Sequence, residues 1–278
     1  MPVRQFLPWS RPVLPAAVDY LTADAHGPSQ HTIALVPTAE AGRRLREALL
    51  PVAGQAGLPH IITPEQITQW TLKDLPSVAT SADLLLTWMQ VLQYVSLEDY
   101  QNLFPVPPVS RDTGWARSTA AELLRLRHRL EEGRKTIADT ANRLGPGHPE
   151  AGRWRDLAKI EALAAAALKR SGMTDPVLAR LSASSRPAFP PGVTRIVLLA
   201  VPDPVHLVIA ALENAEAAGM RIEVLVHADS DCAHLFDAWG RPLPELWTER
   251  VIDIPEPNER ICLKPRPDEE AGAMVETL

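Results

Sequence analysis

Short, uninterrupted runs of apolar residues recur along this chain, and most of them lead into a helical pattern. The clearest run covers residues 33–36, Ile-Ala-Leu-Val, and passes through a Pro-Thr turn into an amphipathic helix. Further runs occupy residues 59–63, 195–199 and 222–226. Apolar runs of this length are typical of strands in a parallel sheet that is covered on both faces. The pattern therefore predicts an α/β fold.

The helix after the first run has clear start signals and two distinct faces. Thr38 is suited to cap its N-terminus, and Glu40 places a negative charge in the first turn, which the helix dipole favours. Its apolar stripe consists of Ala41, Leu45, Ala48 and Leu49, which leaves Arg43, Arg44 and Arg46 for solvent. A strand that leads into a threonine-capped helix N-terminus is a suitable site for phosphate oxygens.

Proline-rich connections divide the chain into blocks. Residues 1–76 form the first half of an α/β core, residues 77–190 a helical insertion lobe, and residues 191–254 the second half of the core. We expect the runs at 33–36, 195–199 and 222–226 to share one sheet, because neither half alone has enough strands to cover its apolar faces. Between the last two runs we expect a helix that Gly219 terminates.

The composition favours a cytoplasmic protein without a membrane segment. Hydrophobic residues make up 46% and charged residues 22% of the chain, and the formal net charge is -6. This charge argues against a generally basic protein that coats nucleic acid, but it allows a local basic face. Two cysteines are too few for a disulfide framework. The proline-broken N-terminus is a poor signal peptide, and no apolar run is long enough to span a bilayer.

Two acidic segments follow the later apolar runs. Asp203 lies between two prolines, and we interpret it as the cap of the following helix. The segment from His227 to His234 contains Asp229, Asp231 and Cys232, all possible zinc ligands, but its spacing matches no standard metal motif. We therefore expect turn-forming residues there and no metal.

Basic residues are dense in the helical block. They are Arg117, Arg125, Arg127, Arg129, Arg134, Lys135, Arg143, Arg153, Arg155 and Lys159. One interpretation is an ordinary solvated helix face with intrahelical ion pairs. The other is a surface that follows a phosphate backbone, to which Trp115, Trp154 and His128 would add stacking. At helical spacing we expect the two tryptophans to be core residues, and we expect Trp239 and Trp247 to pack under the sheet edge.

The order of these segments resembles that of superfamily I DNA helicases. TIALVPTAEAGRRLREALL is similar to their second conserved segment, PHIITPEQITQW to the next, and RIVLLAVPDP stands where the Walker B strand belongs. IEVLVHADSDCAHLF stands where the following strand and its sensor loop belong. The closest resemblance is to the N-terminal helicase-like domain of the B subunit of AddAB-type helicase–nucleases. It implies a parallel-sheet core like that of P-loop NTPases, with a large helical insertion.

The resemblance also implies a function, although the nucleotide machinery is missing. No glycine-rich loop precedes the first apolar run, and no lysine occurs before Lys73. Phosphoryl transfer in this class requires that lysine and acidic residues for magnesium. We therefore expect a non-catalytic domain of a DNA double-strand-break repair subunit, without cofactor or metal. Its partners would be DNA, single-stranded or at duplex ends, and a motor helicase–nuclease subunit. The resemblance places DNA contacts at Thr38 and Thr63. Arg43 and Arg44 are added as expected contacts because of their position on the helix that follows Thr38.

Two alternatives remain open at this point. One is a nucleotide-using or hydrolytic α/β enzyme with its site near Asp203, Asp229 and Asp231; the other is a pure protein-interaction module. No catalytic triad or nuclease motif is present, although the full-length protein would carry a C-terminal nuclease in this family. An apolar helix face from Asp268 stops at Leu278, so we expect residues 255–278 to begin a further domain of a longer protein.

Overall fold

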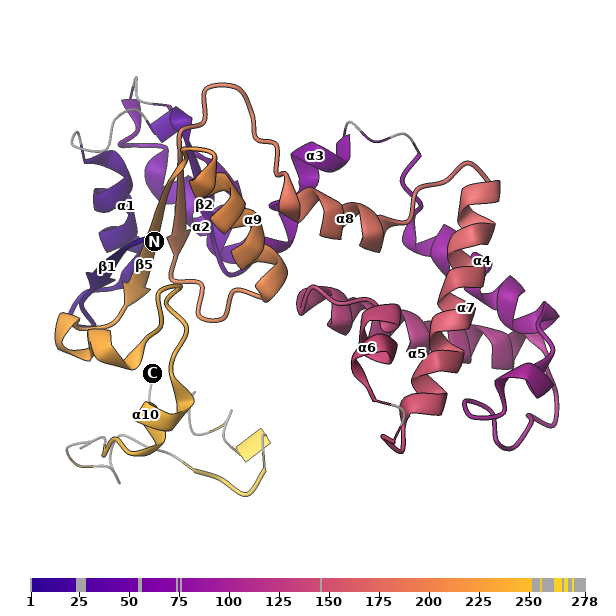
Figure 1. Cartoon of the computed structure of the whole chain (residues 1–278). Coiled ribbons are helices and arrows are strands. Elements are labelled where there is room, and N and C mark those ends of the chain that lie inside the picture. The colour runs from indigo at the N-terminus through magenta and orange to yellow at the C-terminus, as the bar shows by residue number, and fades with distance from the viewer. Residues whose placement is uncertain are drawn as a thin grey trace. The chain divides into compact units, whose positions relative to one another are not determined.

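The computed structural model describes residues 2–23, 29–54, 57–73, 75, 77–145, 147–251, 256, 263–266, 268–269 and 272. It divides into one unit that covers residues 1–242 and a second that covers residues 243–278. The first unit contains a five-stranded sheet with the order β1-β5-β4-β2-β3 (Figure 1). All neighbouring strands run parallel. The expected α/β fold with a parallel sheet is therefore confirmed.

The three expected strands share this sheet. The strands are β1 (Val3–Leu7), β2 (Thr32–Leu35), β3 (His60–Ile62), β4 (Arg195–Leu199) and β5 (Arg221–His227). In the register, Ile33 lies beside Ile196, and Ile196 lies beside Ile222. Every residue of β2 and β4 is buried, as expected for strands with both faces covered. Residues far apart in the sequence therefore form the centre of one core.

The strand β1 was not predicted from the sequence. It pairs with β5 at one edge of the sheet; Val3 to Phe6 alternate between exposed and partly buried positions, and Leu7 is buried. Arg4 and Gln5 interrupt the apolar pattern, and prolines stand on both sides of the strand. An edge strand needs no continuous apolar run, because solvent reaches it from one side.

Helices cover both faces of the sheet. On one face, α1 (Val13–Thr22) and α2 (Ala39–Leu49) share a buried cluster with the strand residues Ala34, Val36, Val197, Leu199 and Leu225. The chain runs from β2 to β3 in one direction and from β4 to β5 in the other. Right-handed crossovers therefore place α9 (His206–Ala217) on the opposite face. Gly219 adopts φ 95° directly after α9, so it ends this helix as expected.

Residues between β3 and β4 form a helical lobe, and its described residues contain no strand. Its helices are α4 (Ser81–Tyr94), α5 (Thr113–Glu132), α6 (Ile137–Arg143), α7 (Ala151–Arg170) and α8 (Pro176–Ser185). Trp88, Leu123, Ile137 and Ile160 belong to its main core cluster. Backbone hydrogen bonds from Ala79 and Thr174 join the start of the lobe to the segment before α8. The expected helical character of this block is thus observed.

Shorter elements complete the chain. They are η2 (Ser29–His31), η4 (Pro64–Gln66), α3 (Gln69–Lys73), η5 (Leu97–Tyr100), η6 (Ser230–Leu235) and α10 (Pro244–Thr248), the last in the second unit. The apolar face expected for the C-terminal segment, at Ala271, Met274, Val275 and Leu278, lies outside the described residues. Within the part of the chain that is described, no helix is long and apolar enough to cross a membrane.

A buried charged cluster lies near the amino-terminal ends of β4 and β5. Glu223 is fully buried and accepts a hydrogen bond from the hydroxyl of Tyr20 at 3.1 Å. Arg221 Nη2 lies 2.5 Å from Glu223 Oε1, and Arg195 Nε lies 3.5 Å from Oε2. Burial raises the pKa of Tyr20 to about 12, and the charge of Glu223 adds to this effect. These charges compensate each other within the apolar core.

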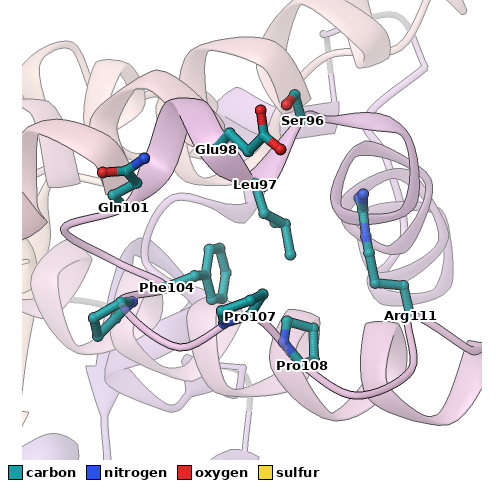
Figure 2. A pocket seen from close by; sticks show the side chains of 9 residues that line it. Ser96, Leu97, Glu98, Gln101, Phe104, Pro107, Pro108 and Arg111 are labelled. Carbon is teal, nitrogen blue, oxygen red and sulfur yellow. The ribbon is translucent and has the colours of Figure 1, made fainter.

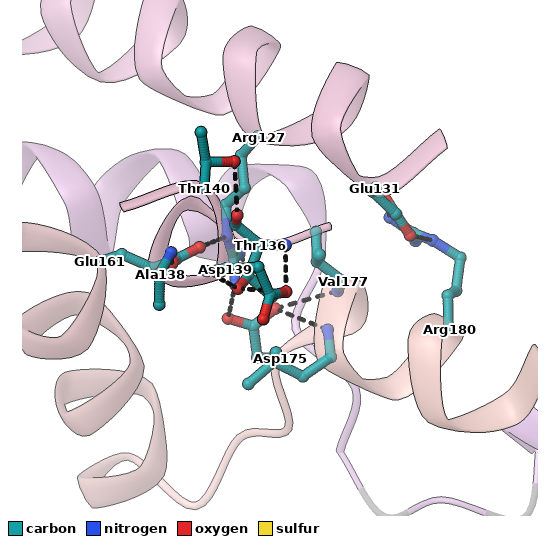
Figure 3. Close-up of polar contacts among 11 residues, drawn as sticks. Arg127, Glu131, Thr136, Ala138, Asp139, Thr140, Glu161, Asp175, Val177 and Arg180 are labelled. Atoms are coloured by element: carbon teal, nitrogen blue, oxygen red, sulfur yellow. Dashed lines mark hydrogen bonds and ion pairs between the residues drawn. The ribbon is translucent and has the colours of Figure 1, made fainter. Parts of the chain in front are cut away.

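A second buried cluster, centred on Arg127, holds the helical lobe together (Figure 3). Arg127 Nε donates to Glu161 at 2.7 Å, and its two Nη atoms donate to Asp175 at 3.0 and 2.6 Å. Asp175 also caps α8 by accepting from the amide of Val177, and Glu161 accepts from the amide of Ala138 in α6. One guanidinium on α5 therefore links α6, α7 and α8.

This cluster corrects the interpretation of Arg127 as a possible surface contact. Only 1% of its side chain is exposed, so it takes no part in a phosphate-binding face. The sequence pattern missed this because Arg127 lies in a run of exposed basic residues, while its acidic partners are 34 and 48 positions away. A buried arginine is tolerable only with such partners, because an unpaired buried charge is strongly destabilising.

Replacing Arg127 by methionine should destabilise the protein by about 3–5 kcal/mol, because Glu161 and Asp175 would be left buried without their cation. The matched control is Arg125→Met on the same helix, where an exposed pair with Glu122 is lost. That control should change the free energy of unfolding by less than about 1 kcal/mol. Urea denaturation measures both values, and equal effects of the two substitutions would contradict the role assigned to Arg127.

The buried hydroxyl of Tyr20 predicts a loss of stability at high pH. Its pKa is about 12 in the folded protein, above the ordinary tyrosine value of about 10, so folding favours the protonated form. This contribution is complete below pH 10 and disappears as the pH rises through 12. Urea denaturation between pH 8 and pH 12 should show a steeper decline for the wild type than for Tyr20→Phe. Parallel curves for the two proteins would show that Tyr20 ionises normally.

Candidate functional site

Five loops follow the five parallel strands and meet at the carboxyl-terminal edge of the sheet. In α/β sheets of this kind, ligands bind at this edge. The loops comprise residues 8–12 after β1, 36–38 after β2, residue 63 after β3, residues 200–205 after β4 and 228–229 after β5. Every residue suggested by the sequence as a site lies on this edge, on the helix that starts there, or in the helical lobe.

Thr38 caps α2 as the sequence predicts. Its backbone is extended, and its Oγ1 accepts a hydrogen bond from the amide of Ala41 at 3.1 Å. Because a hydroxyl can accept and donate at the same time, its hydrogen remains available to a ligand oxygen. The exposed first turn of α2 therefore presents a hydroxyl at the positive end of the helix dipole.

Thr63 occupies the corresponding place after β3. Gln66 Oε1 accepts a hydrogen bond from the Thr63 amide at 3.0 Å, which fixes the turn into η4. The preceding residues are joined to β2, since the amide of Val36 donates to the carbonyl of Ile62 at 3.0 Å. Thr38 and Thr63 thus follow neighbouring strands, and both lie at the carboxyl-terminal ends of those strands.

The arginines of α2 are exposed, as the apolar stripe predicted, but two of them are already paired. Arg43 bonds Glu40 and Glu47, and Arg44 Nε bonds Glu40 at 2.9 Å. The hydrogen bonds from Arg43 and then from Arg44 lower the pKa of Glu40 to about 2. Arg46 has no ion pair within the described residues. Sequence reasoning selected Arg43 and Arg44 and left Arg46 out, although its charge is the least compensated.

Asp203 does not cap the helix that follows β4. The chain stays extended through Pro204 and Val205, so α9 begins only at His206, and Val205 is the capping position without a side-chain hydrogen bond. The prediction was wrong because α9 begins two residues later than an Asp203 cap would require. Asp203 is exposed, and no hydrogen bond to its side chain is observed among the described residues.

The polar segment after β5 connects two loops. The amide of Trp9 donates to Asp229 Oδ1 at 3.1 Å, and its indole donates to the carbonyl of His227 at 2.8 Å. Cys232 is buried and Asp231 is exposed, so the expected turn-forming role fits this segment. Among the described side chains, no three potential metal ligands gather at one point.

The aromatic loop beyond η6 packs on β5. Trp239 is buried, and a Cβ atom at Gly240 would approach Val224 and Val226 to 3.0 Å. Gly240 also has φ 78°, a conformation that side chains rarely adopt. Trp239 is thus buried in a loop that lies against β5, a strand inside the sheet and not at its edge, and Trp247 belongs to the second unit.

Of the basic residues that the sequence pattern singled out in the helical lobe, all except Arg127 are exposed. Arg125, Arg153 and Lys159 form ion pairs on their own helices, as the solvated-face interpretation predicts. Trp115 and Trp154 pack against the core of the lobe, so stacking on bases is not their role.

The proline-rich segment at residues 104–109 helps to enclose a hollow of about 420 Å³ in the lobe (Figure 2). Leu97, Phe104, Pro107 and Pro108 line it, and Arg111 stands at one side. Arg111 donates to the carbonyl of Leu92, and its guanidinium lies 5.8 Å from the ring of Trp115. Residues 96–111 alone build this hollow, so it shares no residue with the carboxyl edge of the sheet.

Comparison with models of protein families finds no match to the chain, and no curated protein matches it.

Replacing Thr38 by alanine should cost about 1 kcal/mol of stability, because the amide of Ala41 loses its capping partner. Thr38→Ser keeps the hydroxyl and should remain within about 0.5 kcal/mol of the wild type. The measurement is urea denaturation followed by circular dichroism. If alanine and serine behaved alike, the hydroxyl would not be the cap.

Proposed function

We propose that this chain is a non-catalytic, helicase-like domain of a cytoplasmic DNA-repair subunit. In this proposal it holds DNA at the carboxyl edge of its sheet and forms a scaffold for a partner motor subunit. The observation that carries the proposal is the position of Thr38 and Thr63, which follow adjacent parallel strands in the order that the helicase resemblance requires. A hydroxyl in each of these turns is the kind of group that contacts a nucleic-acid backbone.

The first strand–loop–helix unit supports the non-catalytic part of this proposal. A nucleoside-triphosphate cradle needs a glycine-rich loop with a lysine between a strand and a helix. Here β1 and α1 are joined by Pro-Trp-Ser-Arg-Pro at residues 8–12, which contains neither glycine nor lysine. Trp9 is bonded to the loop after β5, as described above. This loop is better suited to hydrogen-bond the neighbouring strand β5 and its loop than to surround phosphates.

The charge distribution implies weak binding with little sequence preference. The arginines of α2 face phosphates rather than base edges in this arrangement, and phosphate contacts carry no direct sequence information. Glu40 and Glu47 already offset part of their charge. We therefore expect the chain to position and orient DNA within a larger complex, in which a motor subunit supplies the force.

The chain should bind a fluorescent 20-nucleotide oligothymidine weakly, with an affinity that falls as NaCl is raised from 50 to 200 mM. With two or three phosphates neutralised, the logarithm of the affinity should fall with that of the salt concentration with a slope of about -1.4 to -2. Arg43→Glu combined with Arg44→Glu should abolish binding. Glu40→Gln should strengthen it several-fold, because both arginines lose a competing carboxylate. Fluorescence anisotropy measures all of these values.

A matched control separates a local contact from the general effect of charge. Arg117→Glu combined with Arg129→Glu changes the net charge by the same amount on exposed positions of α5. This variant should bind nearly as well as the wild type. If both double variants lost binding equally, or if the α2 variant bound normally while folded, the edge of the sheet would not be the contact surface.

A further inference from the structure

The point where the winding of the sheet reverses lies between β2 and β4. The chain leaves β2 toward β3 and leaves β4 toward β5, so the two following helices diverge to opposite faces. Diverging connections leave a crevice outside the carboxyl ends of the two strands, and this is the general ligand position of open α/β sheets. In this protein the crevice opens beside Pro37 and Ala200.

A cavity of about 220 Å³ occupies this position, on the face covered by α1 and α2. Its walls are almost entirely apolar. They comprise Val13, Leu14, Ala17, Val36, Pro37, Ala41, Leu45, Leu199 and Ala200, with Arg44 as the one charged residue. Apolar walls disfavour a nucleotide, whose phosphates and base edges would lose their hydrogen bonds on burial. The walls suit a small apolar body.

The backbone in the cavity wall is strained. Ala200 adopts φ 48°, the left-handed conformation that is unfavourable for a residue with a Cβ atom. A glycine would relieve the strain but would remove the methyl group that lines the cavity. Strain of this kind is concentrated at functional positions. It is therefore a second feature, independent of the cavity's shape, that distinguishes this crevice from the rest of the edge.

Arg44 supplies the polar part of the site. Its Nε is bound to Glu40, whereas its two Nη groups have no partner among the described residues. A guanidinium with free Nη groups binds a carboxylate or another single anionic group through charge-assisted hydrogen bonds. No other charged residue lines the cavity, so the two Nη groups of Arg44 offer hydrogen bonds to one anionic group.

We propose that the crevice between β2 and β4 is a binding site for a small apolar molecule with one anionic group. Its apolar body lies between α1 and α2, and its anion lies on Arg44. This site takes a ligand other than DNA, and the proposal does not depend on DNA binding. Hexanoate is the probe, since it has a compact apolar chain and one carboxylate, and hexanol is its neutral analogue.

The test is a titration of the whole chain with hexanoate, followed by methyl NMR. Saturable shifts are expected at the methyl groups of Val13, Leu14, Leu45 and Leu199, with a roughly millimolar Kd. Hexanol should bind about tenfold more weakly, because it lacks the charged hydrogen bond. Arg44→Gln should weaken hexanoate about tenfold and leave hexanol unchanged. The control Arg46→Gln removes a neighbouring charge outside the cavity and should change neither.

A second pair of variants tests the cavity itself. Ala41→Leu fills it with a good helix former and should abolish the binding of both probes. Ala48→Leu, on the same helix and also partly buried against the core but outside the cavity, should keep both. Shifts that do not saturate, shifts at other methyl groups, or equal binding by the Ala41→Leu variant would overturn the proposal. Equal affinity for hexanol and hexanoate would overturn its anionic part.

Discussion

The pairing of β2 with β4 is the contact on which the rest of this structure depends. These strands are separated by the whole helical lobe, yet every residue in both is buried. Neither strand is stable at an exposed edge with such a sequence, so the two halves of the core must close on each other. That closure fixes the strand order and the faces that the helices cover. It also brings the loops after β2, β3 and β4 to one side.

The amino-terminal and carboxyl-terminal ends of the strands have different roles. At the amino-terminal end, Glu223 is compensated by Tyr20 and by arginines, an arrangement that stabilises the core and leaves no charge for a ligand. At the carboxyl end, hydroxyls, partly compensated arginines and a strained Ala200 remain accessible. Arg127 performs the stabilising task in the helical lobe, where one buried cation replaces a larger apolar core.

The features that the sequence predicted correctly are those with local causes. Continuous apolar runs identified β2, β4 and β5, and the Thr38 cap and the exposed arginines of α2 followed from helical spacing. The errors arose where residues far apart in the sequence determine the local structure. Arg127 was read as exposed because its partners on α7 and α8 are far away in the sequence. The strand β1 was missed because Arg4 and Gln5 interrupt its apolar pattern. The crevice beside Ala200 depends on φ and strand order, which no local pattern reveals.

The central claim is that the carboxyl edge of the sheet holds DNA. Its most direct test is hydrogen–deuterium exchange of the whole chain with and without an oligothymidine 20-mer. It reports where the backbone is covered, without any substitution. The proposed function predicts slower exchange in peptides that span residues 37–46 and 63–66, and unchanged exchange in α5. Protection confined to α5, or no protection at a concentration that saturates binding, would contradict it.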